Sequence, residues 1–199
     1  MRMKKIYFAA PFLIAFAIFI FTPIFFGNIV GQTNEKNYNA EGGSLKYHSS
    51  VCKEIIRANG ERKNLGCGHN LFTNLGKNIS RDLLGLQPFA AGTGAVNVIG
   101  LGNSSTTQLS SDTVLGSEWV NCGLGRAAGT VSKIDSSVGN WTISNVFTNG
   151  CANDNVNATG LYNSTSGNWL FAETTLSGIG NDFLQPSDQL NITWYIWIS

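Results

Sequence analysis

The chain has 199 residues, of which 43% are hydrophobic and only 13% are charged, and its formal net charge is +1. Soluble domains carry about 25% charged residues, so this chain is poor in charge, and Asn, Gly, Ser and Thr fill the gap. The composition argues against a basic nucleic-acid-binding protein, a disordered acidic chain and, because acid, base and nucleophile candidates are scattered, an enzyme.

The N-terminal end has the pattern of an export segment. Three basic residues within positions 1–5 precede an apolar run over 6–26, and this order is typical of export signals. At about 1.5 Å per residue the run would reach about 30 Å, enough to span a bilayer, whereas signal-peptide cores are usually about 7–15 residues. Residues 1–31 are therefore either a signal peptide cleaved before Gln32 or a retained N-terminal membrane anchor. Both alternatives place the remaining chain outside the cell or on its surface.

The next segment, 32–50, is polar and turn-rich and predicts a flexible arm ahead of a domain over 51–199. Within that domain, Asn59-Gly60 is a strong signal for a two-residue hairpin turn. This turn places Cys52 opposite Cys67 on a hydrogen-bonded pair, with Cα atoms about 5.5 Å apart, which a disulfide can bridge.

A helix is predicted after this hairpin. Apolar residues recur every four positions, at Leu71, Leu75, Ile79 and Leu83. This spacing predicts an amphipathic helix over 70–86 that packs on a sheet. Asn70 or Thr73 would cap its start and Gly85 would suit its end, while Gly76 weakens the prediction.

The rest of the chain has a β pattern. Short strands are predicted at 96–101, 118–120, 124–134, 141–148, 156–162, 169–175 and 189–198, with turn-rich segments between them. The last strand is apolar on both faces and is expected to be covered on both sides. The predicted fold is mainly β: an antiparallel β-sandwich of the jelly-roll or Ig-like kind, with one amphipathic helix near the start of the domain.

All four cysteines follow the export segment, which predicts two disulfides among three possible pairings. A four-residue loop over 135–138 would place Cys122 opposite Cys151, so the predicted pairs are Cys52–Cys67 and Cys122–Cys151. The alternative is zinc, held by the first pair together with the only two histidines, His48 and His69. Their spacing matches no common zinc finger and exported thiols normally oxidise, so no metal is expected.

Six Asn-x-Ser/Thr triplets suggest N-linked glycans: Asn78, Asn103, Asn140, Asn157, Asn163 and Asn191. Asn103, Asn140 and Asn163 fall in or beside predicted loops and are the favoured acceptors. Asn191, inside the last predicted strand, is the least favoured.

From about residue 69 the chain resembles small β-sandwich modules of tailed-virus structural proteins. The matching stretches include His69-Asn-Leu-Phe-Thr-Asn-Leu-Gly76, Val98-Ile-Gly-Leu-Gly102, Asp112-Thr-Val-Leu-Gly-Ser-Glu118, Gly139-Asn-Trp-Thr-Ile-Ser-Asn-Val-Phe147, Gly160-Leu-Tyr-Asn-Ser-Thr-Ser-Gly167 and Asp188-Gln-Leu-Asn-Ile-Thr-Trp-Tyr-Ile-Trp-Ile198. The resemblance implies a tail or fibre component without catalytic residues. The export segment, cysteines and glycosylation triplets depart from that family. In layout the chain is also similar to archaeal surface-filament subunits, in which an N-terminal arm completes a neighbour's sheet.

The search for chemistry finds weak candidates. Glu118, Glu173 and Asp182 could supply paired carboxylates for glycoside cleavage, but their spacing does not support this reaction. Five tryptophans could line a sugar site, although tryptophan in a small sandwich is more often in the core. Donation of a strand to a neighbour's sheet requires an extended segment with alternating apolar residues. This alternation is poor over 32–43 and better over 44–56.

These patterns favour an exported cell-surface structural protein, a self-associating subunit of an extracellular filament, appendage or envelope assembly. The alternative is a surface adhesin, a carbohydrate- or receptor-binding module, or a virion fibre component. No catalytic activity, cofactor or nucleic-acid partner is expected. A membrane would be contacted only through residues 6–26, if they are not cleaved.

Overall fold

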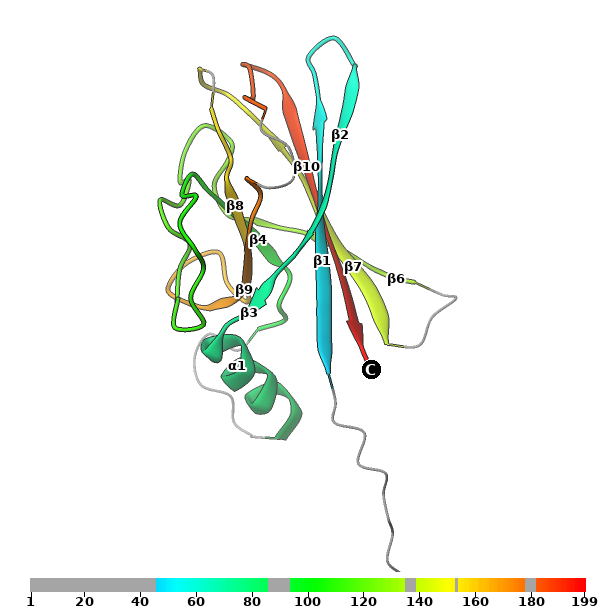
Figure 1. The fold of residues 1–199 in the computed structure, drawn as a ribbon, viewed down its shortest axis with the longest axis vertical. Coiled ribbons are helices and arrows are strands. Elements are labelled where there is room, and N and C mark those ends of the chain that lie inside the picture. Colours follow the sequence, from blue (N-terminus) through cyan, green and yellow to red (C-terminus); the bar gives the residue numbers. More distant parts are fainter. Residues whose placement is uncertain (1–45, 86–93, 135–138, 153, 178–181) are drawn as a thin grey trace, which may run out of the picture. The chain divides into compact units, whose positions relative to one another are not determined.

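The computed structural model describes residues 46–85, 94–134, 139–152, 154–177 and 182–199 (Figure 1). The predicted export segment, and the arm up to residue 45, lie outside the described residues. The elements are β1 (Tyr47–Ile56), β2 (Arg62–His69), β3 (Leu71–Phe72), α1 (Asn74–Gly85), β4 (Val98–Gly102), β5 (Ala127–Ala128), β6 (Thr130–Lys133), β7 (Asn140–Thr148), β8 (Ala158–Tyr162), β9 (Leu170–Thr175) and β10 (Gln189–Ile198). The domain is mainly β with one short helix, as the sequence predicts.

The strands form two antiparallel sheets of five strands each. Sheet A has the order β2-β1-β10-β7-β6, and sheet B has the order β3-β9-β8-β4-β5. Strand β1 begins at Tyr47, so residues 47–50 belong to a central strand and not to the predicted arm. At the same end of the sheet, Lys46 and Ser199 exchange two backbone hydrogen bonds, of 2.7 and 3.1 Å.

The chain passes between the two sheets at both edges. At one edge β2 ends at His69 and β3 begins at Leu71 in the other sheet. At the opposite edge Gly129 separates β5 of sheet B from β6 of sheet A. A Cβ atom at Gly129 would lie 2.7 Å from Cγ2 of Ile143, so this crossing needs a residue without a side chain. The single strand predicted over 124–134 is therefore wrong, because the chain changes sheets inside it.

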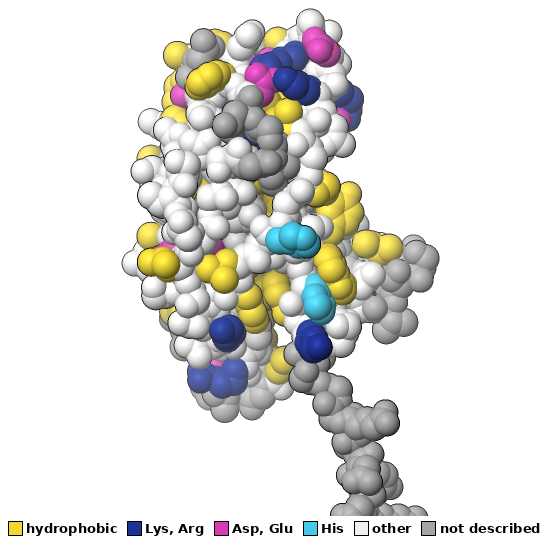
Figure 2. Space-filling model, in the orientation of Figure 1, with side chains coloured by type: hydrophobic (Ala, Val, Ile, Leu, Met, Phe, Trp, Pro, Cys, Tyr) yellow, Lys and Arg dark blue, Asp and Glu magenta, His cyan; other side chains and the backbone are white. Residues whose placement is uncertain are grey.

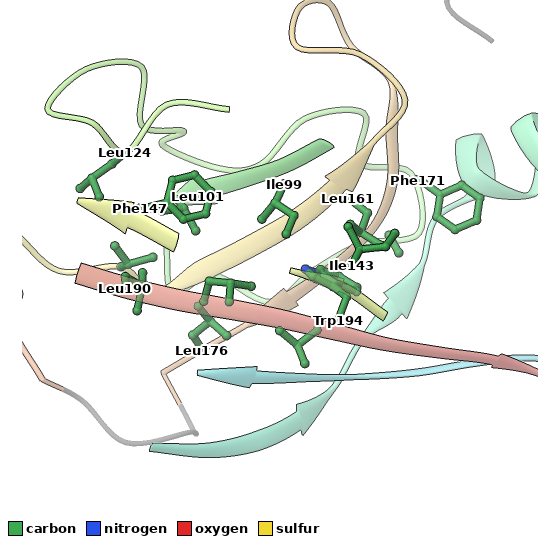
Figure 3. Packing of buried hydrophobic residues seen from close by; sticks show 14 of the residues in the cluster. Ile99, Leu101, Leu124, Ile143, Phe147, Leu161, Phe171, Leu176, Leu190 and Trp194 are labelled. Carbon is green, nitrogen blue, oxygen red and sulfur yellow. The ribbon is translucent and has the colours of Figure 1, made fainter. Parts of the chain in front are cut away.

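One hydrophobic core lies between the sheets (Figure 3). Sheet A contributes Val51, Ile55, Ile143, Phe147, Leu190, Ile192, Trp194 and Ile196, and sheet B contributes Ile99, Leu101, Leu161, Phe171 and Ala172. All of these side chains are at least nine-tenths buried. Removal of this apolar area from water is the main term that stabilises the fold, at about 25 cal/mol per Å².

The two faces of β10 are not equally covered. Leu190, Ile192, Trp194 and Ile196 are buried, whereas Tyr195 on the opposite face is 39% exposed. The expectation that this strand is covered on both sides is therefore wrong. Its apolar outward residues lie on the outer face of sheet A, which no other described strand or helix covers.

The first hairpin contains the predicted cysteine pair, but its turn and its strand register differ from the prediction. Three residues follow Arg57 in the turn: Arg57 donates its N–H to the Glu61 carbonyl at 2.8 Å, and Gly60 has a φ of 88°. This turn shifts the register by one residue, and a β-bulge between Lys53 and Glu54, opposite Gly66, shifts it back. Cys52 therefore pairs with Cys67, and their Cα atoms are 4.0 Å apart. This separation is typical of a non-hydrogen-bonded pair, so the predicted pair type is wrong.

The second predicted hairpin is also shifted. Strands β6 and β7 pair Lys133 with Trp141, one residue away from the register that a loop over 135–138 would impose; that loop lies outside the described residues. Cys122, with a φ of 59°, lies in a turn, and Cys151 follows β7, so neither cysteine is on a strand. Their Cα atoms are nevertheless 5.3 Å apart.

The helix begins later than the periodicity predicts. Leu71 and Phe72 form β3 and pair with β9, because they continue the chain out of β2. Thr73 is the N-cap: its Oγ1 accepts the N–H of Gly76 at 2.9 Å. A Cβ atom at Gly76 would lie 2.0 Å from the Phe171 carbonyl oxygen, so this glycine lets α1 approach β9 closely.

The remaining strands agree with their predicted positions to within about two residues, except the segment at 118–120. There only Glu118 forms an isolated bridge, to Gly102. Residues 103–126 contain no regular strand. Their Leu115 packs on the outer face of sheet B, residues 117–119 bond to β4, and Leu124 belongs to the core between the sheets.

Candidate functional site

The outer face of sheet B carries a second hydrophobic cluster: Val98, Leu115, Ala158, Tyr162 and Leu170. Leu115 comes from the 103–126 segment, which therefore packs against the sheet. Two glycines at the centre of this face, Gly100 and Gly160, make room for the contact. A Cβ atom at Gly160 would lie 3.2 Å from Leu115, and one at Gly100 would lie 2.7 Å from the Tyr162 ring.

A polar cluster lies on the outer face of sheet B, over the space that Gly100 and Gly160 leave free of side chains. The guanidinium of Arg126 lies over the ring of Tyr162, with Cζ 3.5 Å from the ring centroid. The same guanidinium donates two hydrogen bonds to the Glu118 carboxylate, including Nη2 to Oε2 at 2.8 Å. Both charged side chains are mostly buried, with 10% of Arg126 and 15% of Glu118 exposed. A buried pair of this kind is costly to break from one side.

The hydroxyl of Tyr162 joins the cluster to the covering segment, residues 103–126. It accepts the N–H of Leu115 at 2.9 Å and donates to Glu118 Oε2 at 3.3 Å. Burial, followed by the negative charge of Glu118, raises the pKa of Tyr162 well above its usual value. The phenol therefore stays protonated and neutral at physiological pH.

A cavity of about 490 Å³ opens beside the cluster. Its lining combines the charged pair with Trp119, two exposed valines, and the small polar side chains of the turn after β8. The residues concerned are Val114, Trp119, Val120, Thr165, Ser166 and Asn168. The Nε1 of Trp119 is buried without a hydrogen-bond partner among the described residues. The cavity is large enough for a small organic ligand.

A second cavity, of about 320 Å³, shares Val114 and Leu115 with the first and so lies next to it. Its polar lining consists of Ser104, Thr106, Thr107, Gln108, Asp112 and Glu173. Glu173 is only 3% exposed, and its Oε1 has no hydrogen-bond partner in the described part of the chain. Burial, and secondly the neighbouring Asp112 carboxyl, raise the pKa of Glu173 to about 8.

The carboxylates proposed for glycoside cleavage have different surroundings. Glu118 is paired with Arg126, and Glu173 lies beside Asp112 in the adjacent cavity. Asp182 instead accepts hydrogen bonds from Arg57 at 2.5 Å and Lys63 at 3.0 Å. The three residues share no cavity among those that the structure shows. Nothing in the sequence pointed to Arg126 or Asp112, because their contacts with Tyr162 and Glu173 form only when the chain folds.

The structure contains both disulfides, Cys52–Cys67 and Cys122–Cys151, in the predicted pairing. The cysteines therefore offer no thiolate to a metal, and the zinc alternative does not fit. Among the described residues, no three His, Cys, Asp or Glu side chains gather in an arrangement that could hold a metal ion. The two disulfides fit an oxidising compartment.

The two histidines lie close together on the surface (Figure 2). With Tyr47, Asn70, Phe72 and Trp197 they line a smaller cavity of about 210 Å³. The ring of His48 stacks on Trp197 with a centroid distance of 5.4 Å, and its Nε2 is 3.1 Å from Ser199 Oγ. Stacking and hydrogen bonding within the chain account for His48 without a ligand.

The six glycosylation triplets differ in accessibility. Asn78, on α1, and Asn103 are exposed, while Asn140, Asn157 and Asn191 are half-buried. Asn157 Nδ2 donates to the Asn103 backbone carbonyl at 2.9 Å, and Asn191 Nδ2 donates to Glu54 at 3.3 Å.

Asn163 does not lie in an exposed loop as predicted. It follows β8 directly and is only 7% exposed, and both of its side-chain polar atoms are enclosed. A glycan on its Nδ2 is therefore incompatible with this fold.

Comparison of the chain with protein-family models, with curated proteins and with solved structures finds no match. Within the described ranges, no helix has both the length and the apolar character needed to cross a membrane. The fold, the disulfides and the two adjacent cavities are therefore the observations on which a functional proposal rests.

Proposed function

We propose that the protein is an exported cell-surface structural component, a subunit of an extracellular filament, appendage or envelope assembly. The main supporting observation is the pair of disulfides, one within the β1–β2 hairpin and one between two loops. They occur in a chain whose N-terminal residues have the pattern of an export signal. Disulfides persist outside the reducing cytosol, where a small exported module benefits from them. The proposal includes N-linked glycans at exposed triplets, a jelly-roll or Ig-like sandwich topology, and a role without catalysis. We include in the same proposal the resemblance to tail and fibre components of tailed viruses and to archaeal surface-filament subunits.

The place of β1 restricts how subunits would join. Strand β1 lies between β2 and β10 of its own sheet, and Val51 and Ile55 are fully buried in its own core. Residues 47–56 are thus already used within the subunit, which disfavours their donation to a neighbour. The edge strand β6 is a better point of addition, because its four residues are all exposed and an unpaired edge is a template for another strand.

Electron microscopy of native material from the cell surface tests the assembly. Regular filaments or arrays are expected, and uniformly monomeric protein in native extracts would oppose the proposal. An edge variant, Val131→Lys, sharpens the test because Val131 on β6 is 52% exposed. A charge there should prevent strand addition without unfolding the domain. Val146→Lys, at a 47% exposed position on the interior strand β7, is the matched control and should assemble normally.

A second candidate function is a carbohydrate- or receptor-binding module, and the 490 Å³ cavity favours it. Trp119 supplies an aromatic wall, and Thr165, Ser166 and Asn168 supply hydroxyl and amide groups, a combination suited to a neutral polar ligand. A glycan array tests this candidate. Hits that disappear in Trp119→Ala but persist in Trp197→Ala would support this cavity, whereas hits that survive Trp119→Ala would exclude it.

A further inference from the structure

Glu173 is an unusual residue for the place it occupies. It lies on β9 and faces the 103–126 segment, it is 97% buried, and one carboxyl oxygen has no partner within the described residues. A buried ionised carboxyl without a partner costs several kcal/mol, so such groups are paired, bind a cation or, in an empty site, take up a proton. Among the described residues, no Lys or Arg lines the cavity that contains Glu173.

The other polar side chains of that cavity are all potential oxygen donors. Asp112 supplies a second carboxyl beside Glu173, Gln108 an amide oxygen, and Ser104, Thr106 and Thr107 hydroxyl oxygens. The described lining residues include neither sulfur nor imidazole. Hard divalent cations prefer such oxygen-only surroundings, and Ca²⁺ accepts carboxylates, amide and carbonyl oxygens and water in irregular geometry.

We propose that this cavity is a Ca²⁺-binding site in which Asp112 and Glu173 provide the charged ligands. The neutral oxygens of the 104–108 segment and water complete the coordination. Two carboxylates balance the charge of one divalent ion, and the volume of about 320 Å³ leaves room for retained water. The sequence led us to expect no metal anywhere in the chain, and this proposal departs from that expectation.

The bound ion would fasten the covering segment to the sheet. Asp112 already holds its own loop, because its Oδ2 accepts the Leu109 N–H at 2.9 Å, whereas Glu173 belongs to β9. An ion shared by both carboxylates therefore connects residues 61 positions apart in the chain. The same segment forms the wall of the 490 Å³ cavity through Val114 and Leu115. The site is independent of whether subunits assemble.

Calorimetric titration of the chelator-treated, disulfide-intact protein with CaCl₂ tests the proposal directly. The protein should be produced in a host that exports it, so that residues 1–31 are cleaved or retained as in the native protein. One Ca²⁺ per chain is expected, with a dissociation constant of about 10⁻⁴–10⁻³ M, the range of extracellular modules. Glu173→Gln and Asp112→Asn keep the side-chain shape and should each weaken binding more than about tenfold.

Glu54→Gln is the matched control, because it removes a carboxylate of the same type from a different small cavity on the outer face of sheet A. This variant should bind Ca²⁺ like the parent, and near-ultraviolet circular dichroism checks that every variant is folded. Absence of Ca²⁺ binding in the parent protein would overturn the proposal. So would binding that persists in both Glu173→Gln and Asp112→Asn, or tighter binding of Mg²⁺ than of Ca²⁺ at the same stoichiometry.

Discussion

The guanidinium of Arg126 is held between the Tyr162 ring, 3.5 Å from its centroid, and the carboxylate of Glu118. Removal of the cation leaves Glu118 buried and unpaired, so Arg126→Met should lower the free energy of unfolding by about 3 kcal/mol. Urea denaturation measures this loss. The double variant Arg126→Met/Glu118→Gln should recover part of it. If the single and double variants are equally unstable, the ion pair is not the cause.

The exposed pair between Arg62 and Glu54 provides the comparison for this prediction. Its arginine side chain is 65% exposed and its N–O distance is 3.3 Å. Surface pairs contribute about 0–1 kcal/mol. Arg62→Met should therefore change the unfolding midpoint far less than Arg126→Met in the same experiment.

The sequence predicted the strands well where alternation is strong and the chain stays in one sheet, as for β8, β9 and β10. It failed where a strand changes sheets at Gly129, because the residue pattern over 124–134 remains locally β-like. The Cys52–Cys67 pairing was predicted correctly although the predicted turn was wrong by one residue. The β-bulge at Gly66 shifts the strand register back by one residue. Turn type and bulge depend on backbone geometry that periodicity does not encode.

The candidate site was beyond prediction for a different reason. Its polar and charged residues come from segments separated by tens of residues: Glu118 and Arg126 from the covering segment, Tyr162 from β8 and Glu173 from β9. Each residue alone looks like an ordinary strand or loop position. Only the packing of the 103–126 segment on sheet B brings them together.

Gly76→Ala should destabilise the protein, although alanine favours helices by about 1 kcal/mol relative to glycine. The added Cβ would lie 2.0 Å from the Phe171 carbonyl oxygen, so α1 must move away from β9. We expect a loss of about 1–3 kcal/mol in thermal or urea unfolding. Asn78→Ala, at an exposed position of the same helix, should instead be neutral or slightly stabilising. Greater stability in Gly76→Ala would contradict the close packing of α1 on β9.

Glu173 should make stability fall as pH rises. Its pKa, raised from 4.5 to about 8, means that the folded state binds more protons than the unfolded state between those values. Stability from this group is therefore complete below pH 4.5 and is lost as pH rises to about 8. In Ca²⁺-free buffer, Glu173→Gln should remove that decline, which is on the order of a few kcal/mol. Unfolding free energies across pH 4–9 measure it, and parallel curves for parent and variant would refute it.

Lys53 should have a pH effect in the opposite direction. Its side chain is 1% exposed, its Nζ donates to the Val156 carbonyl at 3.2 Å, and burial lowers its pKa from 10.5 to about 8. The folded state then binds fewer protons between these values, so this contribution is present above pH 10.5 and is lost as pH falls through 8. Lys53→Met should be more stable than the parent at pH 6, and this gain should shrink toward pH 10. Equal stability at pH 6 would show that the amine is better solvated than its burial indicates.

The two disulfides should differ in importance. Replacement of Cys122 and Cys151 by alanine should cost about 3–4 kcal/mol, because this bridge closes 29 residues between loops that no strand ladder joins. Cys52 and Cys67 already face each other within the β1–β2 ladder, so their replacement should cost less. Thermal unfolding of both double variants measures the order, and the reverse order would contradict this interpretation.

The backbone bonds between Lys46 and Ser199 bring the two ends of the described domain to one corner. Tension applied between the preceding arm and the C-terminus would therefore enter and leave at the same point. It would open the β1–β10 ladder one hydrogen bond at a time, with no shear along the strands. A domain loaded through these two ends would yield at the β1–β10 ladder first.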